Sequence, residues 1–288
     1  MLELRKVTKT FGKNVTAVED LSLRLEPGVA GLIGHNGAGK TTLMQMIATL
    51  TRPTGGQILF DGVDIAARPQ AIRARLGYLP QDFSVYRNVS ALEFMQYFAA
   101  LKGVRDPARI RRLLELVNLH EQASRMASTF SGGMLRRLGI AQALLNDPDI
   151  LVVDEPTAGL DPEERLRFRN LLAELGFHKL VLISTHIVSD VESIAGRLAI
   201  MKNGRLVACD TPEAILGRAR GQVWSASVGA VEYDVLRATT HVLQALRQGE
   251  RIALRIAHPS LPCPGALPSE PSLEEALMAQ RYAVKEAA

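Results

Sequence analysis

Residues 34–42 read Gly34-His35-Asn36-Gly37-Ala38-Gly39-Lys40-Thr41-Thr42, and this stretch decides the fold. It fits the pattern G-x-x-x-x-G-K-[ST] of a phosphate-binding P-loop. The apolar run 29–33 before it predicts a buried strand, and residues 43–48 after it predict a helix. A strand, this loop and a helix, in that order, are the context that the motif requires.

The residue types of the loop suit a bound nucleotide triphosphate, and we expect all nine residues to contact it. Glycines at positions 34, 37 and 39 let the backbone approach phosphates closely and allow positive φ. Lys40 would place its charge on the β- and γ-phosphates, and the Thr41 hydroxyl would ligate Mg²⁺. The simpler alternative is a glycine-rich turn before an ordinary helix, and the flanking strand and helix argue against it.

The composition is that of a globular protein with a sizeable core. The chain has 288 residues, of which 47% are apolar, and a formal net charge of +4. This mild basicity does not indicate nucleic acid as a partner. Its two cysteines, Cys209 and Cys263, form no disulfide framework, which fits a reduced compartment. No run of about 18 apolar residues occurs, so we expect any membrane function to come through a partner protein.

Apolar periodicity predicts a mostly parallel sheet with an antiparallel sheet before it. Residues 2–25 alternate between apolar and polar positions, which predicts antiparallel strands joined by a turn near residues 12–14. Further strands are expected at 29–33, 57–60, 75–79, 149–154, 180–184, 197–202 and 205–209. Buried strands that alternate with helices, here 162–175 and 188–194, are typical of a parallel sheet covered on both faces.

Two further regions differ in pattern from this core. From residue 83 to about 145, apolar residues recur at helical spacing, which predicts an inserted helical subdomain. After residue 217 we expect a small β-rich appendix, a loop with five prolines at 259–271, and a last helix whose capping box begins at Ser272. The predicted fold class is therefore α/β, a P-loop NTPase domain at 1–217 followed by an accessory region at 218–288.

Two carboxylates end the apolar strand before Pro156. Asp154, at the strand tip, would hold Mg²⁺, usually through water, opposite Thr41. Glu155 follows directly, so its side chain points elsewhere and can polarise an attacking water. The alternative interpretation is a strand stopped by an acidic, proline-capped turn.

A second candidate anion site precedes that strand. Ser131, Gly132 and Gly133 predict a serine N-cap with glycines that expose N–H groups at a helix start, although a plain helix cap is the alternative. With the P-loop and the acidic pair, the sequence now resembles the ATP-binding-cassette (ABC) family, whose signature usually reads Leu-Ser-Gly-Gly-Gln. Phe130 and Met134 depart from that signature. The resemblance implies that its intact Ser-Gly-Gly core meets the γ-phosphate of ATP bound to a second copy.

The resemblance covers residues 1 to about 217 and implies roles for four more residues. Phe11 resembles the aromatic that stacks on adenine, normally Tyr, with a core Phe as the alternative. Gln81 resembles the Q-loop glutamine near Mg²⁺ and the γ-phosphate, and Asp161 resembles the D-loop aspartate. His186 resembles the switch histidine, which holds Glu155, the water and the γ-phosphate in register.

Within the family, the amino-acid sequences of segments 77–82, 134–138 and 271–275 are similar to those of ATPase subunits of bacterial ABC-2-type exporters. This implies ATP and Mg²⁺ as cofactors, hydrolysis by Lys40, Glu155 and His186, and a homodimer or heterodimer of ATPase subunits. It also implies an integral membrane permease as partner, no nucleic acid, and a place at the cytoplasmic face of the membrane. The alternatives are a soluble non-transport ABC ATPase and a module that binds ATP without hydrolysing it.

The segment 83–101 is expected to dock the permease, because it carries more apolar residues than one helix face can bury. Leu92, Met95 and Ala99 share one stripe and are expected to face the core. Phe94, Tyr97 and Phe98 fall largely outside it, and the loop residues Val85 and Tyr86 precede the helix. The alternative is that these aromatics pack inward.

Overall fold

The computed structural model describes residues 1–12 and 14–286. Its contacts divide the chain into two compact units, Met1–Cys209 and Asp210–Ala288. In the described part of the chain, none of the helices combines the length and the apolar character needed to cross a bilayer. Lys13, in the middle of the turn expected near 12–14, lies outside the described residues.

The core of the first unit is a six-stranded sheet in the order β10-β9-β3-β8-β7-β6. Its strands are β3 (Gly28–Ile33), β6 (Leu76–Leu79), β7 (Ile150–Asp154), β8 (Leu180–Thr185), β9 (Arg197–Lys202) and β10 (Arg205–Asp210). Strand β3 pairs in parallel with β8 and β9, and β7 pairs in parallel with β6 and β8. Every residue of β7 and β8 is buried, as expected for parallel strands covered on both faces. The predicted mostly parallel core sheet is confirmed.

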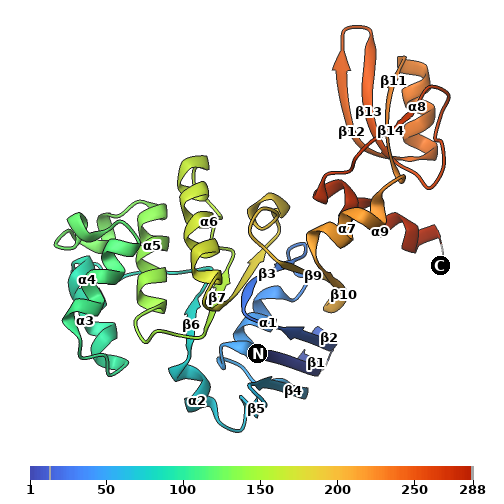
Figure 1. Cartoon of the computed structure of the whole chain (residues 1–288). Coiled ribbons are helices and arrows are strands. Elements are labelled where there is room, and N and C mark those ends of the chain that lie inside the picture. The colour runs from blue at the N-terminus through green and yellow to red at the C-terminus, as the bar shows by residue number, and fades with distance from the viewer. Residues whose placement is uncertain (13, 287–288) are drawn as a thin grey trace. The chain divides into compact units, whose positions relative to one another are not determined.

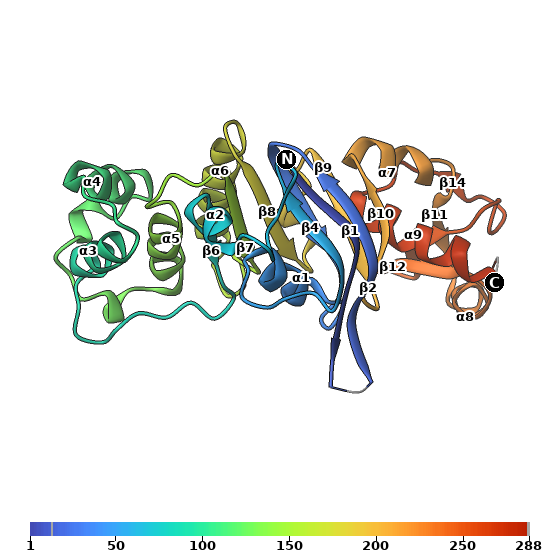
Figure 2. The ribbon, with the colours of Figure 1, turned by 90° about the horizontal axis from the view of Figure 1, so that it is seen from below.

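An antiparallel sheet in the order β2-β1-β4-β5 packs across helix α1 from this core, as Figure 2 shows. Its strands are β1 (Leu2–Phe11), β2 (Val15–Leu25), β4 (Gly55–Phe60) and β5 (Val63–Asp64). Helix α1 (Lys40–Ile47) buries Leu43, Met44, Met46 and Ile47 in the hydrophobic core that the two sheets share. The first turn of α1, which ends the P-loop, is thereby held between two sheets.

Helices α3 (Ala91–Leu101), α4 (Pro107–Leu116) and α5 (Gly132–Ala143) form the predicted helical subdomain, to one side of the core sheet (Figure 1). The prediction of which residues of α3 are buried is partly wrong. Phe94 is 2% exposed and Leu92 is 36% exposed. The reason is an aromatic cluster, in which the rings of Phe83 and Phe98 lie 5.9 and 4.8 Å from that of Phe94.

Two further helices belong to this unit, α2 (Pro69–Ala74) and α6 (Pro162–Gly176). The helix expected at 188–194 is wrong, because only a 3₁₀ turn forms at Val188–Asp190. β-Branched residues at 188, 191 and 194 lower the helix propensity of this short segment. Further 3₁₀ turns lie at His120–Gln122 and Ala127–Thr129.

Over its described residues, the second unit is an antiparallel sheet in the order β12-β13-β11-β14 with three helices. Its elements are α7 (Pro212–Ala219), β11 (Val223–Val228), α8 (Ala230–Thr239), β12 (His241–Gln248), β13 (Arg251–Ala257), β14 (Leu267–Pro268) and α9 (Leu273–Glu286). The capping box expected at Ser272 is present, since Ser272 and Glu275 exchange hydrogen bonds of 2.8 and 3.2 Å. Helix α8 was not expected.

The structure divides the chain before the boundary expected at 217. Cys209 packs against the core of the first unit, whereas helix α7 packs against α9 of the second. Ile215, in α7, is fully buried. The expected boundary therefore cuts a helix, and the divide lies between Cys209 and Asp210.

Candidate functional site

The P-loop conformation depends on its glycines in two ways. Gly37 and Gly39 have φ of 82° and 99°, a left-handed conformation that other residues rarely adopt. A Cβ on Gly39 would also lie 2.3 Å from the carbonyl oxygen of Ala17. Gly34 lies outside the positive-φ region, contrary to the expectation, but a Cβ there would lie 2.6 Å from the carbonyl oxygen of Met201. The loop is therefore packed too closely for side chains at 34 and 39.

Lys40 begins α1 and folds its side chain back over the loop. Its Nζ donates to the carbonyl oxygens of Gly34 at 2.7 Å and His35 at 3.2 Å. The same ammonium lies 3.3 Å from Oε1 of Glu155, and both side chains are buried. A buried charge is costly unless a group of opposite sign lies beside it, and this contact gives the Lys40 ammonium and the Glu155 carboxylate such a partner.

Glu155 links the P-loop to the end of β8. Its backbone is left-handed, with φ of 47°, so the chain turns sharply after β7. Its second oxygen, Oε2, lies 2.7 Å from Nδ1 of His186. The carboxylate therefore contacts Lys40 and His186 at once. A carboxylate held in this way can orient a water molecule or accept its proton.

Asp154 offers an oxygen that fits a divalent cation. Its side chain is fully buried, and Oδ1 accepts a hydrogen bond of 2.5 Å from the Ser184 hydroxyl. Among the described residues, the buried Oδ2 has no hydrogen-bond partner. Mg²⁺ prefers hard oxygen ligands and retains water, so this unpartnered carboxylate oxygen fits an Mg²⁺ site. Burial, and then the charge of Asp154, raise the pKa of Tyr78 on β6 to about 12.

A pocket of about 400 Å³ brings much of the predicted site together. It is lined by Ala17, Asn36, Gly37, Gly39, Lys40, Thr41, Thr42, Gln81, Glu155, Ala158 and His186. Ala17 is not predicted as a site residue by the sequence, whereas Ala158 begins the segment 158–161 that resembles the D-loop. Of the residues expected to bind the nucleotide or Mg²⁺ of their own chain, five do not line the pocket, namely Phe11, Gly34, His35, Ala38 and Asp154. Gly34 and His35 instead present their carbonyls to Lys40, and Ala38 is buried beneath the loop.

Phe11 stands apart from the pocket at the end of β1. The side chain is 45% exposed, so the alternative of a core phenylalanine is wrong. The ammonium of Lys9 lies 5.0 Å from the ring centre. An exposed aromatic face of this kind remains available for stacking.

The Ser-Gly-Gly segment does not contribute to the pocket of its own chain. Ser131 caps α5, and its Oγ accepts a hydrogen bond of 3.2 Å from the N–H of Met134. Ser131 and Gly132 are exposed. A Cβ on the buried Gly133 would lie 2.7 Å from a carboxylate oxygen of Glu164. Asp161 similarly caps α6, accepting from the N–H of Glu164 at 2.9 Å. Both are helix caps within this chain.

Four buried polar residues behind the pocket were not predicted from the sequence as parts of the site. Ser184 bonds to both Asp154 and the backbone N–H of Glu155. Buried Asp190 accepts from the hydroxyls of Thr157 and Thr185, and thus ties the turn after β7 to the end of β8. The only signal in the sequence was their nearness to Glu155 or His186.

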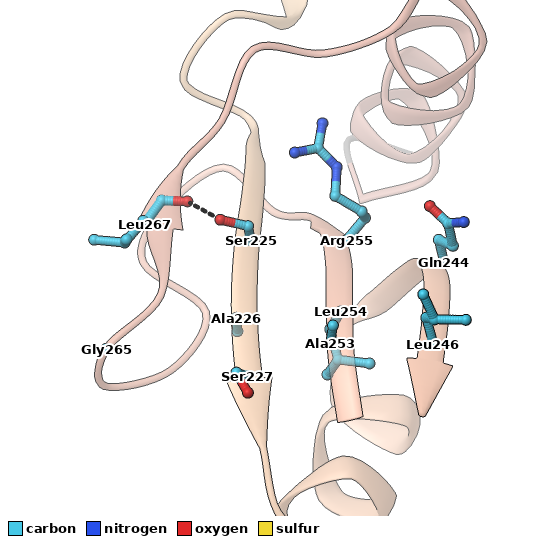
Figure 3. A pocket seen from close by; sticks show the side chains of 10 residues that line it. All are labelled: Ser225, Ala226, Ser227, Gln244, Leu246, Ala253, Leu254, Arg255, Gly265 and Leu267. Carbon is cyan, nitrogen blue, oxygen red and sulfur yellow. Dashed lines mark hydrogen bonds between the residues drawn. The ribbon is translucent and has the colours of Figure 1, made fainter. Parts of the chain in front are cut away.

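A second pocket, in the C-terminal unit, lacks comparable chemistry. It measures about 460 Å³ and is lined by Ser225, Ala226, Ser227, Gln244, Leu246, Ala253, Leu254, Arg255, Gly265 and Leu267 (Figure 3). Among the described residues that line it, Arg255 alone is ionisable, and both its Nε and its Nη2 lie 2.7 Å from carboxylate oxygens of Glu275. This pairing raises the pKa of Arg255 further. The P-loop pocket is therefore the candidate catalytic site.

The chain is similar to known proteins over the region that forms this pocket. A family model described as "ABC transporter" matches residues 18–158. The Nod factor export ATP-binding protein I of Cupriavidus metallidurans is 38% identical over 224 residues, which cover 75% of this chain and 73% of that one. The methionine import ATP-binding protein MetN of Corynebacterium efficiens is also 38% identical, over 72% of this chain and 61% of that one.

A solved structure shares the arrangement of the elements. It is a dimeric ATP-binding cassette in a post-hydrolysis state, bound to ADP and Pi, with a TM-score of 0.67 and 26% sequence identity. The match covers 73% of this chain and 98% of the cassette. Since relatives and fold agree on the same P-loop domain, the chain belongs to the ABC transporter family and is one of its ATP-binding, ATP-hydrolysing subunits.

Proposed function

We propose that this chain powers export through a separate membrane permease, as one of two ATPase subunits at the cytoplasmic face of the membrane. The observation that carries the proposal is the contact of Glu155 with both Lys40 and His186 in a pocket lined by the P-loop. The direction of transport is inferred from similarity to the Nod factor export protein. It is also inferred from the sequences of segments 77–82 and 134–138, which resemble ABC-2-type exporter subunits.

Within the pocket, each residue would have a distinct role. The P-loop N–H groups would bind the phosphates, and Lys40 would neutralise the charge that spreads over them. Thr41, Gln81 and Asp154 would hold Mg²⁺, which would shield the phosphate charge when bound. Phe11 would stack on the adenine ring.

Glu155 would orient and deprotonate the attacking water, with His186 keeping its carboxylate in place. The ammonium of Lys40 is shared between two carbonyls and Glu155. When phosphates replace Glu155 as its partner, the carboxylate would become available to water. Binding of ATP would thus prepare the base for the reaction.

Completion of the site requires a second subunit, identical or related. The exposed Ser131 and Gly132 lie outside the pocket of their own chain, which supports a head-to-tail arrangement. In that arrangement, Ser131–Gly133 of one subunit would cover the nucleotide of the other, and Asp161 would approach the same interface. Closure would assemble the site, and hydrolysis would release it.

Two linked measurements test this function. The purified chain should hydrolyse Mg-ATP in steady state, and affinity purification from detergent-solubilised membranes should retain a protein with about six membrane-spanning segments. Hydrolysis without any retained membrane protein would instead support a soluble, non-transport ABC ATPase. Binding of ATP without hydrolysis would support a regulatory module.

A further inference from the structure

We propose that Ser184 is a positioning residue that sets both carboxylates at the end of β7. Strands β7 and β8 are parallel neighbours, and their register places Ser184 opposite Asp154. The fully buried Ser184 hydroxyl donates to Oδ1 of Asp154 at 2.5 Å and accepts from the backbone N–H of Glu155 at 2.9 Å. One side chain thus contacts two consecutive residues to which the mechanism assigns different tasks.

The first effect of Ser184 is on the backbone of Glu155. A left-handed φ of 47° is unfavourable for any residue with a Cβ, and here it turns the chain out of the β-ladder. The N–H that leaves the ladder is buried and needs a new acceptor, which the Ser184 hydroxyl provides. This backbone conformation accompanies the side-chain position in which Glu155 contacts Lys40 and His186.

The second effect is on the orientation of Asp154. The hydroxyl occupies Oδ1, while Oδ2 has no partner among the described residues. A carboxylate that binds a cation is generally held by a hydrogen bond of this kind, which prevents it from rotating. Ser184 therefore determines which oxygen of Asp154 remains available.

Alternate residues at the end of β8, Ser184 and His186, both contact Glu155. Ser184 fixes the backbone of Glu155, and His186, two residues later, contacts its carboxylate. Between them, the Thr185 hydroxyl lies 3.4 Å from buried Asp190 instead. The proposal rests on ATP binding and hydrolysis by this chain and does not depend on export.

The test compares Ser184→Ala with Ser184→Thr, which keeps the hydroxyl and suits a strand. Ile183→Val, a change at the neighbouring buried position whose partner on β7 is Val153, is the matched control for lost packing. Binding of a fluorescent ATP analogue is measured in EDTA and again in Mg²⁺, together with kcat, KM and Tm. We expect Ser184→Ala to bind as tightly as wild type in EDTA. Its gain in affinity on adding Mg²⁺ and its kcat should both fall about 10–100-fold.

Ser184→Thr should restore both quantities to within about threefold of wild type, and Ile183→Val should leave them unchanged despite a lower Tm. The proposal is overturned if Ser184→Ala keeps the Mg²⁺-dependent gain and kcat, or if Ile183→Val loses them equally. A wild-type chain without turnover would contradict the ATPase assignment itself. The Mg²⁺-dependent gain in binding would still decide the role of Ser184 in that case.

Discussion

At the scale of single residues, the site depends on one carboxylate with two partners. Glu155 is paired with Lys40 on the P-loop and with His186 after β8, so three segments far apart in the sequence meet at one buried group. Such a group is sensitive to conservative changes, because its charge and its hydrogen bonds are both in use. This allows the proposed roles to be separated by substitution.

Glu155→Gln is expected to bind Mg-ATP but to hydrolyse it about 10²–10⁴-fold more slowly, because the amide cannot accept a proton. The stalled protein should accumulate as an ATP-dependent dimer, which size-exclusion chromatography with and without ATP would detect. Glu163→Gln, at an exposed position on α6, is the control and should behave as wild type. A Glu155→Gln protein that stays monomeric in saturating ATP would contradict both the role of Glu155 and the dimer.

Lys40→Ala should reduce ATP hydrolysis to less than about a tenth of the wild-type rate, because it removes the charge that stabilises the transferring phosphate. It also leaves the buried Glu155 without its cationic partner. Steady-state phosphate release measures the effect, with Lys202→Ala at an exposed position on β9 as control. Retention of more than that tenth would show that Lys40 has another role.

The motif residues could be predicted from the sequence, but their supporting partners could not. Gly37, Gly39 and Lys40 follow from local spacing, which is visible in one stretch of chain. Ser184 contacts Asp154 only because β7 and β8 pair in one particular register. Asp190 likewise accepts from Thr157 across a long interval of sequence. Contacts between strand ends depend on packing of the whole sheet, and a single sequence does not display them.

At the scale of elements, strands and long helices were predictable, and short or weakly patterned helices were not. Strands β7 and β8 are unbroken apolar runs, which parallel pairing explains. Segment 188–194 fails as a helix, and α8 forms despite β-branched residues at 231 and 235. On α3, the buried side is determined by contacts of the Phe94 ring. Its partners are Phe83, on the loop before the helix, and Phe98, one turn further along α3.

The helical subdomain should have a pH-dependent stability that originates at the end of α3. Burial lowers the pKa of Lys102 to about 8, although its ammonium donates to Gln142 O at 3.1 Å and Asn146 Oδ1 at 2.9 Å. Between that value and about 10.5, the unfolded state binds more protons, so stability rises with pH in this window. Below pH 8, Lys102 is charged in both the folded and the unfolded state, so the free energy of unfolding is reduced by the full cost of burying that charge.

Lys102→Met should therefore be more stable than wild type near pH 7.5, by about 1–3 kcal/mol, and the difference should shrink as pH approaches about 10.5. Urea unfolding of both full chains at several pH values measures the difference in their free energies of unfolding. The titration of all other groups is common to the two chains and cancels in this difference. Lys202→Met, an exposed change, is the control. A difference that is constant with pH would contradict this account of Lys102.

At the scale of the whole molecule, the divide between the two units can be tested by truncation. A chain ending at Cys209 retains every strand of the core sheet except the last residue of β10. A chain ending at Gly217 adds most of α7 without α9, the helix that packs against it, so we expect the otherwise buried Pro212 and Ile215 to be exposed. We expect the shorter chain to be the more soluble of the two and to bind ATP, as measured by sedimentation and nucleotide binding. Equal solubility would indicate that α7 belongs with the ATPase unit.

Coupling to the permease should depend on exposed aromatics in the helical subdomain. Tyr86, in the loop after Gln81, and Tyr97, on α3, are 58% and 50% exposed. Their rings lie 5.9 Å apart in an edge-to-face arrangement, so they form one apolar patch. The Arg136 guanidinium donates to Pro80 O at 3.1 Å, which ties this loop to the helix that carries the Ser-Gly-Gly segment. A partner held at the patch would therefore sense dimer closure.

Changing Tyr86 and Tyr97 together to Ser should leave ATP hydrolysis by the free subunit within about twofold of wild type, because both rings are at least half exposed and neither lines the P-loop pocket. Retention of the membrane partner in detergent should fall at least about tenfold, since aromatic anchors dominate interface energies. Phe177→Ser, which removes an 80% exposed aromatic after α6, is the matched control and should retain the partner. If the double variant also retains it, the coupling surface lies elsewhere. If its Tm falls strongly, these rings stabilise the fold and the alternative of inward packing regains support.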